Sequence, residues 1–105
     1  MDLIKVSGSS RTSAVAGAIA GVVRDHQRAE VQAIGAQAVN QAVKSLALAR
    51  RYLQRDNLEI VVTPEFVEIS IEEKIRTAIR FTVEIRQNVT QPFDSEKIAE
   101  VPTSP

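Results

Sequence analysis

The sequence predicts a single α+β domain whose elements follow the order β-α-β-α-β-β. Two observations predict this class. A short apolar strand runs directly into an Ala-rich helical pattern between Val31 and Arg51, and a cleanly alternating strand covers Thr77 to Arg86. Because strand–helix–strand crossovers are right-handed, both helices should pack on one face of a four-stranded mixed sheet.

The first third of the chain predicts a strand, a polar loop and a helix. The strand covers Leu3 to Val6, and residues 7–12 read SGSSRT. A Ser or Thr of this loop is expected to cap the helix, which extends to about Gln27. Gly17 and Gly21 lie inside that helix, and each costs roughly 1 kcal/mol relative to Ala. We expect close packing against a neighbouring element to explain the two glycines.

The second strand is expected at residues 30–34, followed by the long helix. Gly35 fits the turn between them, because glycine readily adopts a positive φ. The helix should run to about Asp56 and end at Asn57, which tolerates the left-handed conformation. One apolar stripe with helical spacing is expected to be buried: Val39, Val43, Leu46 and Leu53. The alanines around it should let another element pack close: Ala38, Ala42, Ala47 and Ala49.

The last third predicts two strands joined by a hairpin. The third strand covers Leu58 to Thr63, and Pro64 marks an edge, bulge or bend, because it cannot donate a ladder hydrogen bond. Apolar residues then alternate from Phe66 to Ile71, and residues 72–74 form a polar hairpin tip. In the returning strand one face is apolar and the other polar: Ile79, Phe81, Val83 and Ile85 against Arg80, Thr82, Glu84 and Arg86.

Composition limits the domain organisation and the class of protein. We expect a folded domain at residues 1–86 and a flexible tail at 87–105, which contains three of the four prolines. The longest apolar run, Ala14 to Val23, is too short to cross a bilayer. The N-terminus lacks the features of a signal peptide. The expectation is a cytoplasmic protein with no membrane partner.

The charged and reactive residues do not predict an enzyme. The chain has no cysteine and one histidine, His26, so neither zinc binding nor Cys/His chemistry is expected. Four glutamates lie on or near the hairpin, where a solvated arm is a simpler explanation than a metal site: Glu65, Glu68, Glu72 and Glu73. The chain has no P-loop and no dinucleotide fingerprint. We expect no catalytic residue, metal, cofactor or small-molecule substrate.

Several segments of the chain resemble a known family. The pattern A-x-G-x-x-A-V-N-x-A-V, which begins at Ala33, resembles the central motif of Alba-type nucleic-acid-binding proteins. The closer resemblance, over about residues 1–86, is to the stage V sporulation protein S family. It rests on KVS from Lys5, SAVAGAIAGVVR from Ser13, EVQAIGAQAVNQAVK from Glu30 and RTAI from Arg76. The resemblance implies an Alba-like fold, nucleic-acid binding and a regulatory role in sporulation or cell-division development.

The loop around Arg11 is the first candidate for nucleic-acid binding. It leads into a helix N-terminus, where free N–H groups and the helix dipole favour an anion. The alternative is that a hydroxyl caps the helix and Arg11 is solvated. Ser9 stands where the stage V family commonly has Lys, and Gln37 where archaeal Alba proteins have a basic residue. The candidate residues are Lys5, Ser9, Ser10, Arg11, Ser13, Gln37, Arg76 and Arg80.

Two functions remain open at this point. The first is a regulator of the Alba type that acts as a homodimer or tetramer and binds DNA or RNA. We expect this binding to be weak, because the acidic hairpin tip should repel phosphates. The second is an oligomeric protein-interaction module on the same fold that binds no nucleic acid. Net charge is zero, with 13 basic and 13 acidic residues, which argues against a general polyanion binder. Leu48 and Tyr52 project off the main helix stripe and are the candidate oligomer interface.

Overall fold

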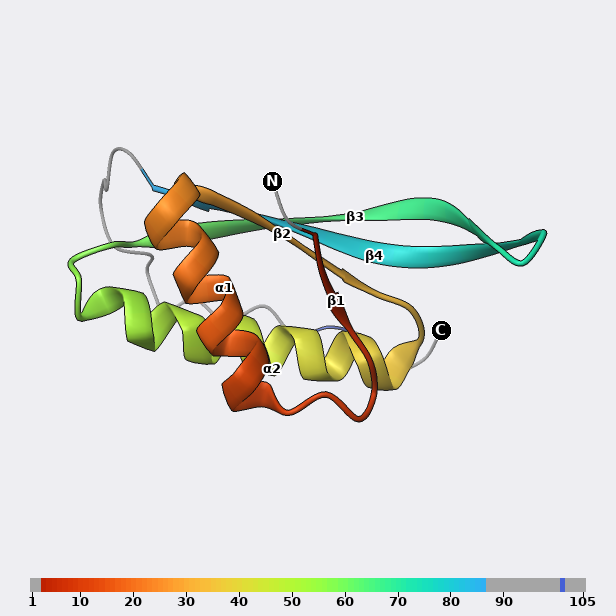
Figure 1. Cartoon of the computed structure of the whole chain (residues 1–105), viewed down its shortest axis with the longest axis horizontal. Helices are drawn as coiled ribbons and strands as arrows, with labels where there is room; N and C mark the ends of the chain where they lie inside the picture. Colours follow the sequence, from red (N-terminus) through yellow and green to blue (C-terminus); the bar gives the residue numbers. More distant parts are fainter. Residues whose placement is uncertain (1–2, 87–100, 102–105) are drawn as a thin grey trace.

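The computed structural model describes residues 3–86 and Val101, and it confirms the expected order of elements (Figure 1). The expectation of a tail at residues 87–105 falls, apart from Val101, outside the described residues. The elements are β1 (Leu3–Val6), α1 (Thr12–His26), β2 (Arg28–Ala33), α2 (Ala36–Gln54), β3 (Ile60–Ile71) and β4 (Lys74–Ile85).

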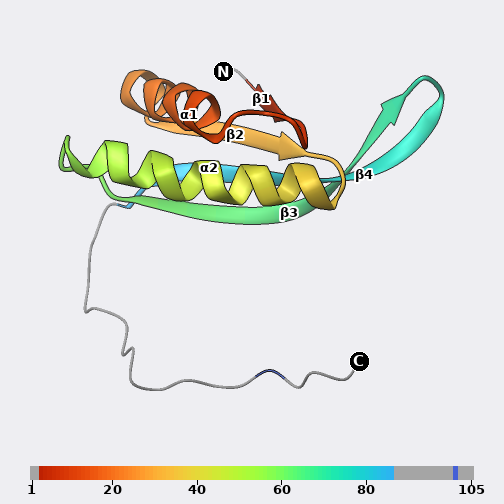
Figure 2. The ribbon, with the colours of Figure 1, turned by 90° about the horizontal axis from the view of Figure 1, so that it is seen from below.

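The four strands form one mixed sheet in the order β1-β2-β4-β3. β1 and β2 are parallel, and β4 runs antiparallel to both of its neighbours. α1 and α2 pack against each other and lie on one face of the sheet, as predicted (Figures 1 and 2). Among residues 3–86, no helix covers the opposite face, and we call it the open face.

β3 and β4 continue well past the end of β2. β2 pairs only with residues 79–84 of β4, whereas β3 pairs with β4 along its whole length. The excess, residues 67–78, projects from the domain as a two-stranded hairpin that we call the arm (Figure 1). Its tip is Glu72 and Glu73, which both have positive φ, as the central residues of a tight hairpin turn require.

The core lies between the sheet and the two helices. β2 contributes Ala29, Val31 and Ala33, all at most 1% exposed. The alternation predicted for β4 is confirmed, because Phe81 and Val83 are buried opposite Val31 and Ala29. The largest fully buried side chains include Ile19, Val23 and Leu53. Burying a side chain of this size contributes about 1.5–3 kcal/mol to stability.

The stripe predicted for α2 is only partly correct. Leu46 and Leu53 are buried, but Val43 is 50% exposed. The buried face is instead centred on small residues: Ala38, Ala42, Ser45 and Ala49. Side chains this small let α1 pack close to α2, and that packing turns Val43 outwards. Ser45 is fully buried, and its hydroxyl donates a 2.7 Å hydrogen bond to the carbonyl oxygen of Gln41.

The turn residues mostly follow the prediction. Gly35 has φ +89 between β2 and α2, and Asn57 has φ +59 just after α2. The third strand does not end at Thr63, because β3 continues without a break to Ile71. Pro64 is accommodated because β3 is an edge strand, where a residue without an N–H leaves the ladder intact on its paired side.

The packing expected at the two glycines of α1 is absent, and that prediction was wrong. A Cβ added at Gly17 or Gly21 would meet no atom within 4 Å, leaving aside the helix's own backbone nearby. Gly17 is exposed and Gly21 is half-buried. No described neighbour therefore requires glycine at either position, and the loss of helix propensity is not compensated by close packing.

Replacing these glycines with alanine should therefore stabilise the domain. We expect Gly17→Ala and Gly21→Ala each to raise the free energy of unfolding by about 0.5–1 kcal/mol, measured by urea denaturation. Gly35→Ala is the matched control. Its φ of +89 and ψ of 159 suit glycine alone, so alanine there should destabilise by about 1–3 kcal/mol. Loss of stability in both α1 variants would contradict this account.

Candidate nucleic-acid interface

The loop between β1 and α1 is closed by its own serines. The Ser7 N–H donates to Ser10 Oγ at 2.9 Å, and the Ser10 N–H donates to the carbonyl oxygen of Ser7 at 3.1 Å. The hydroxyls of Ser7 and Ser9 share a further hydrogen bond of 3.1 Å. These contacts hold three of the loop's hydroxyls within the loop and fix its shape.

Because the serines bond to one another, none of them caps α1. The N-cap residue is Arg11, and it makes no side-chain capping hydrogen bond. The expectation of a Ser or Thr cap was therefore wrong. Among the described residues, no side chain accepts from the N–H groups of the first turn, and the exposed side chains of Arg11 and Ser13 flank them. Such a helix end favours an anion.

The beginning of α2 supports the same loop. Gly8 lies directly against Gln37, because a Cβ on Gly8 would approach the Gln37 Cβ to 3.0 Å. The Gln41 Nε2 donates a 2.8 Å hydrogen bond to the carbonyl oxygen of Ser10. The exposed Gln37 therefore lies next to the serine loop, and the structure brings this candidate together with Ser9, Ser10 and Arg11.

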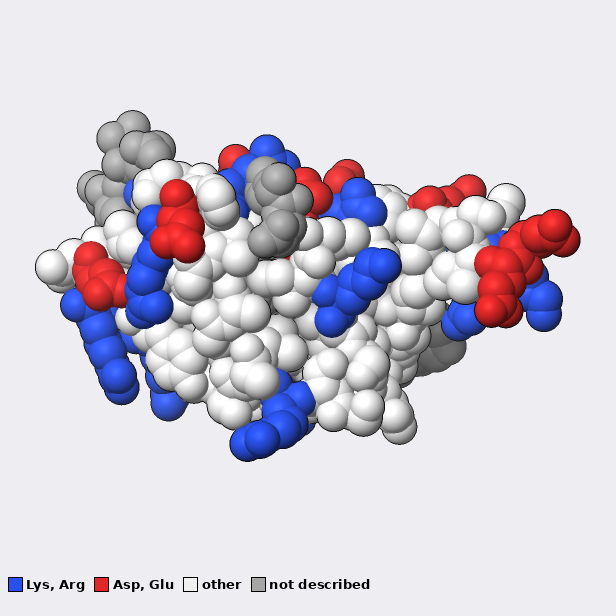
Figure 3. Space-filling model, in the orientation of Figure 1, with Lys and Arg blue, Asp and Glu red and all other residues white. Residues whose placement is uncertain are grey.

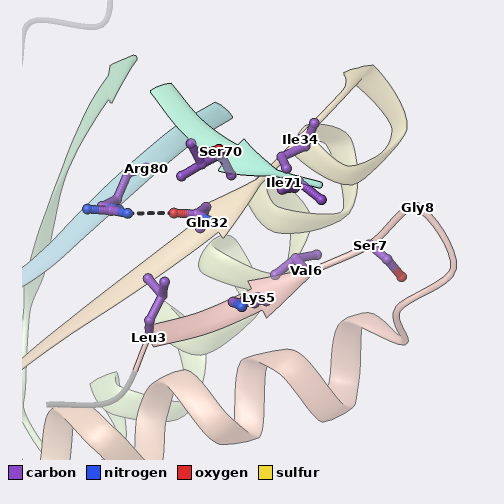
Figure 4. A pocket seen from close by; sticks show the side chains of 11 residues that line it. Leu3, Lys5, Val6, Ser7, Gly8, Gln32, Ile34, Ser70, Ile71 and Arg80 are labelled. Carbon is purple, nitrogen blue, oxygen red and sulfur yellow. Dashed lines mark hydrogen bonds between the residues drawn. The ribbon is translucent and has the colours of Figure 1, made fainter. Parts of the chain in front are cut away.

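A polar row crosses the open face of the sheet beside this loop. Lys5, Gln32 and Arg80 are register partners on β1, β2 and β4. The Arg80 Nη2 donates a 2.6 Å hydrogen bond to Gln32 Oε1, and Gln32 is only 6% exposed (Figure 4). Lys5 is exposed, and two strand spacings place its Cα about 10 Å from that of Arg80.

This row borders a cavity of about 500 Å³, which we call the hollow (Figure 4). It lies between the end of β1 with the following Ser7 and Gly8, the end of β2, and the β3 half of the arm. Gln32 is a residue that the sequence analysis missed. The period of β2 places it on the open face, but only the pairing with β4 shows that it holds Arg80.

The arm continues the row of basic residues. Lys74, Arg76 and Arg80 alternate along β4 and therefore share one face. Arg76 and Arg80 are four residues apart, or about 13 Å along the strand. Glu68 lies on the opposite face, because its register partner is Thr77. Figure 3 shows acidic and basic side chains side by side at the end of the arm.

Elsewhere on the open face opposite charges are adjacent. Arg28 makes a 3.2 Å ion pair with Glu30. Glu65 is the register partner of Arg80, yet within residues 3–86 no ion pair joins them, and Arg80 bonds to Gln32 instead. Three basic side chains near the start of the arm make no ion pair among the described residues: Lys5, Arg76 and Arg80.

The exposed apolar surface lies away from the predicted oligomer residues. Leu48 and Tyr52 are half-buried and pack against the core. Val43 and Val62 border a groove of about 320 Å³ between α2 and β3, which we call the α2–β3 groove. Phe66, on the same strand, is 78% exposed. In the part of the chain that the structure describes, no helix is long and apolar enough to cross a membrane.

Comparison with known proteins supports the fold and gives the family. The solved structure of Alba from Thermoplasma volcanium superposes with a TM-score of 0.55. The match covers 79% of this chain and 99% of that chain at 16% sequence identity, a level that shows a common fold. The sequence profile of the Stage V sporulation protein S (SpoVS) family matches residues 2–86. This match covers the whole sheet, both helices and the arm, and the chain belongs to the stage V sporulation protein S family.

Proposed function

We propose that this protein is a nucleic-acid-binding regulator of the Alba type that acts in sporulation or cell-division development. The observation that carries the proposal is the cluster of basic groups at one end of the sheet. Lys5 and Arg80 flank the hollow, Arg76 extends the row along the arm, and the serine loop with Arg11 lies beside it. Family membership supports the developmental role.

The chemistry of this surface suits phosphates. Arginine offers a planar fork of N–H donors, and the uncapped start of α1 offers backbone N–H groups. Contacts of this kind position a nucleic acid without selecting its sequence. Because the basic groups are few and the arm ends in Glu72 and Glu73, binding should be weak and only modestly sensitive to salt.

A protein-interaction module on the same fold remains the second candidate. The pairing of Arg28 with Glu30, the acidic tip of the arm and the zero net charge favour it. Both candidates are non-enzymatic, and they differ in whether binding depends on phosphate charge.

The first prediction concerns Arg11. With two to four phosphate contacts, the slope of log affinity against log salt on duplex DNA should be about −2 to −4. Arg11→Ala should weaken binding to every sequence to a similar degree and make the slope shallower by about 1. Fluorescence anisotropy at several salt concentrations measures both quantities.

Arg55→Ala is the matched control for this experiment. It removes the same charge from an exposed arginine just after the far end of α2. We expect it to change affinity much less. If the wild-type protein shows no salt-sensitive binding to DNA or RNA at low ionic strength, and Arg11→Ala changes nothing, the interaction-module candidate replaces nucleic-acid binding.

The second prediction concerns the acidic tip. Glu73→Lys should raise affinity for nucleic acid and steepen the salt slope by about 1, because a charge that repels phosphate becomes one that contacts it. Asp25→Lys makes the same charge change at an exposed position near the end of α1. The proposal requires Glu73→Lys to have the larger effect, and equal effects would reduce it to non-specific attraction.

We also infer that two copies associate through the α2–β3 groove. β3 is the edge strand, and the groove beside it exposes Val43 and Val62. Arg50 lines the groove and makes a 2.8 Å ion pair with Glu59. A two-fold dimer would place the same groove of each copy against the other and would bury the exposed valines of both in the contact.

The third prediction tests this association. Val43→Lys should shift the protein towards the monomer in light scattering, because it places a charge on an exposed helix position in the proposed apolar interface. Gln54→Lys, on the exposed end of the same helix, should leave the mass unchanged. A wild-type protein that remains at 11.5 kDa at micromolar concentration would rule out self-association. If the wild type is a dimer and the Val43→Lys variant is equally dimeric, the interface lies elsewhere, for example at Leu48 and Tyr52.

A further inference from the structure

The hollow has two kinds of lining. On one side lie the polar groups of the row that crosses the sheet, Lys5, Gln32 and Arg80. Most of the rest of the lining is aliphatic and comes from β1, the residue after β2 and the β3 half of the arm: Leu3, Val6, Ile34, Ile69 and Ile71. Figure 4 shows these labelled side chains, Ile69 excepted, surrounding the same space. A ligand that fills the hollow would meet cations and apolar surface together.

The aliphatic wall is accessible to a ligand. Ile71 is 44% exposed, and Leu3, Ile34 and Ile69 are half-buried. A bare phosphate would leave these aliphatic side chains exposed to water. The backbone of a duplex would do the same, because the bases of a duplex are stacked inside it. The wall needs a ligand with an apolar, flat part held next to an anionic part, and an unstacked nucleotide has both.

The polar side of the hollow has donors to spare. The Arg80 guanidinium carries five N–H donors. Among the described residues one hydrogen bond from it is found, from Nη2 to Gln32, and its Nε is buried, so the donors left for a ligand are those of the two terminal nitrogens. Because Gln32 accepts through Oε1, its amide NH2 remains a donor for a base edge, and burial of the residue to 6% exposure fixes its position.

We propose that the hollow binds one unstacked nucleotide, with its base against Ile34, Ile69 and Ile71 and its phosphate on Lys5 and Arg80. This inference rests on the proposed nucleic-acid binding and makes it more specific. A base can enter only when it has left the stack, so the protein binds single-stranded nucleic acid in preference to duplex. We propose that this nucleotide is part of a nucleic-acid strand. A free mononucleotide has the same chemistry, and the experiment below distinguishes the two.

The test compares four probes by fluorescence anisotropy at low ionic strength: a short single strand, its duplex, the same single strand with abasic sites, and a mononucleotide as competitor. The abasic strand keeps every phosphate and lacks the bases. We expect the intact strand to bind about tenfold more tightly than the abasic strand, which corresponds to burying roughly 55 Å² of apolar surface at about 25 cal/mol per Å². The duplex should bind as weakly as the abasic strand.

Two variants separate the base from the phosphate. Ile71→Thr keeps a β-branched residue in the strand and removes apolar wall, so it should weaken binding of the intact strand and leave the abasic strand unchanged. Ile75→Thr is the matched control, because Ile75 is 72% exposed on the other strand of the arm and does not line the hollow. Lys5→Gln should weaken both strands equally. Unchanged circular dichroism and melting temperature show that each variant is folded.

The outcomes distinguish this inference from the function on which it rests. Equal affinity for intact strand, abasic strand and duplex, with the salt dependence retained, overturns the nucleotide site and leaves nucleic-acid binding intact. No salt-sensitive binding of any strand overturns both. Saturable binding of the mononucleotide without binding of strands would assign the hollow to free nucleotides and overturn a strand as the source.

Discussion

The pairing of β2 with β4 in a single register is the constraint on which the rest of the structure depends. Along β2, Ala29, Val31 and Ala33 face the helices, while the residues between them face the open side. A slip of one residue would turn Gln32 into the core and an apolar residue out to solvent. The register therefore determines the core and the polar row together, because alternate residues of β2 contribute to each of them.

Small side chains determine how the helices cover this sheet. The alanines of β2, α1 and α2 that line the core are at most 4% exposed, and the two helices pack against each other. Larger side chains fill the rest of the core, among them Ile19, Val31 and Leu53. Val43 on α2, and Val62 and Phe66 on the edge strand β3, stay exposed outside it. Val43 and Val62 border the α2–β3 groove, so this apolar groove lies beside the packed core.

Much of the fold could be predicted from the sequence because its signals are local. The alternation of apolar and polar residues predicted which side chains of β4 face the core. Gly35 and Asn57 have the positive φ that their turns require. The predictions were wrong where a residue distant in the sequence determines the local structure. Val43 faces outwards because α1 packs on the alanine side of α2, and β3 extends past Pro64 because β4 pairs with it. The serines that were expected to cap α1 bond to one another.

The candidate site was harder to predict for the same reason. Lys5 and Arg80 are far apart in the sequence, and only the sheet order places Gln32 between them. The hollow also forms only because the arm lies close to the end of β1. No local pattern in the sequence predicts that these two segments lie close together. Single residues such as Arg11 could be proposed from charge and position, whereas the cavity that joins several of them depends on the tertiary structure.

The arm has a consequence for how the domain opens. Beyond Ala33 it is a two-stranded ribbon that no third strand supports among the described residues, and the side chain of Ile75 is 72% exposed. An isolated hairpin of this kind is marginally stable in water. We therefore expect amide hydrogens of the arm to exchange with solvent while the sheet beneath the helices stays intact. Since Ile69 and Ile71 line the hollow, local unfolding of the ribbon would also remove that part of the wall of the cavity.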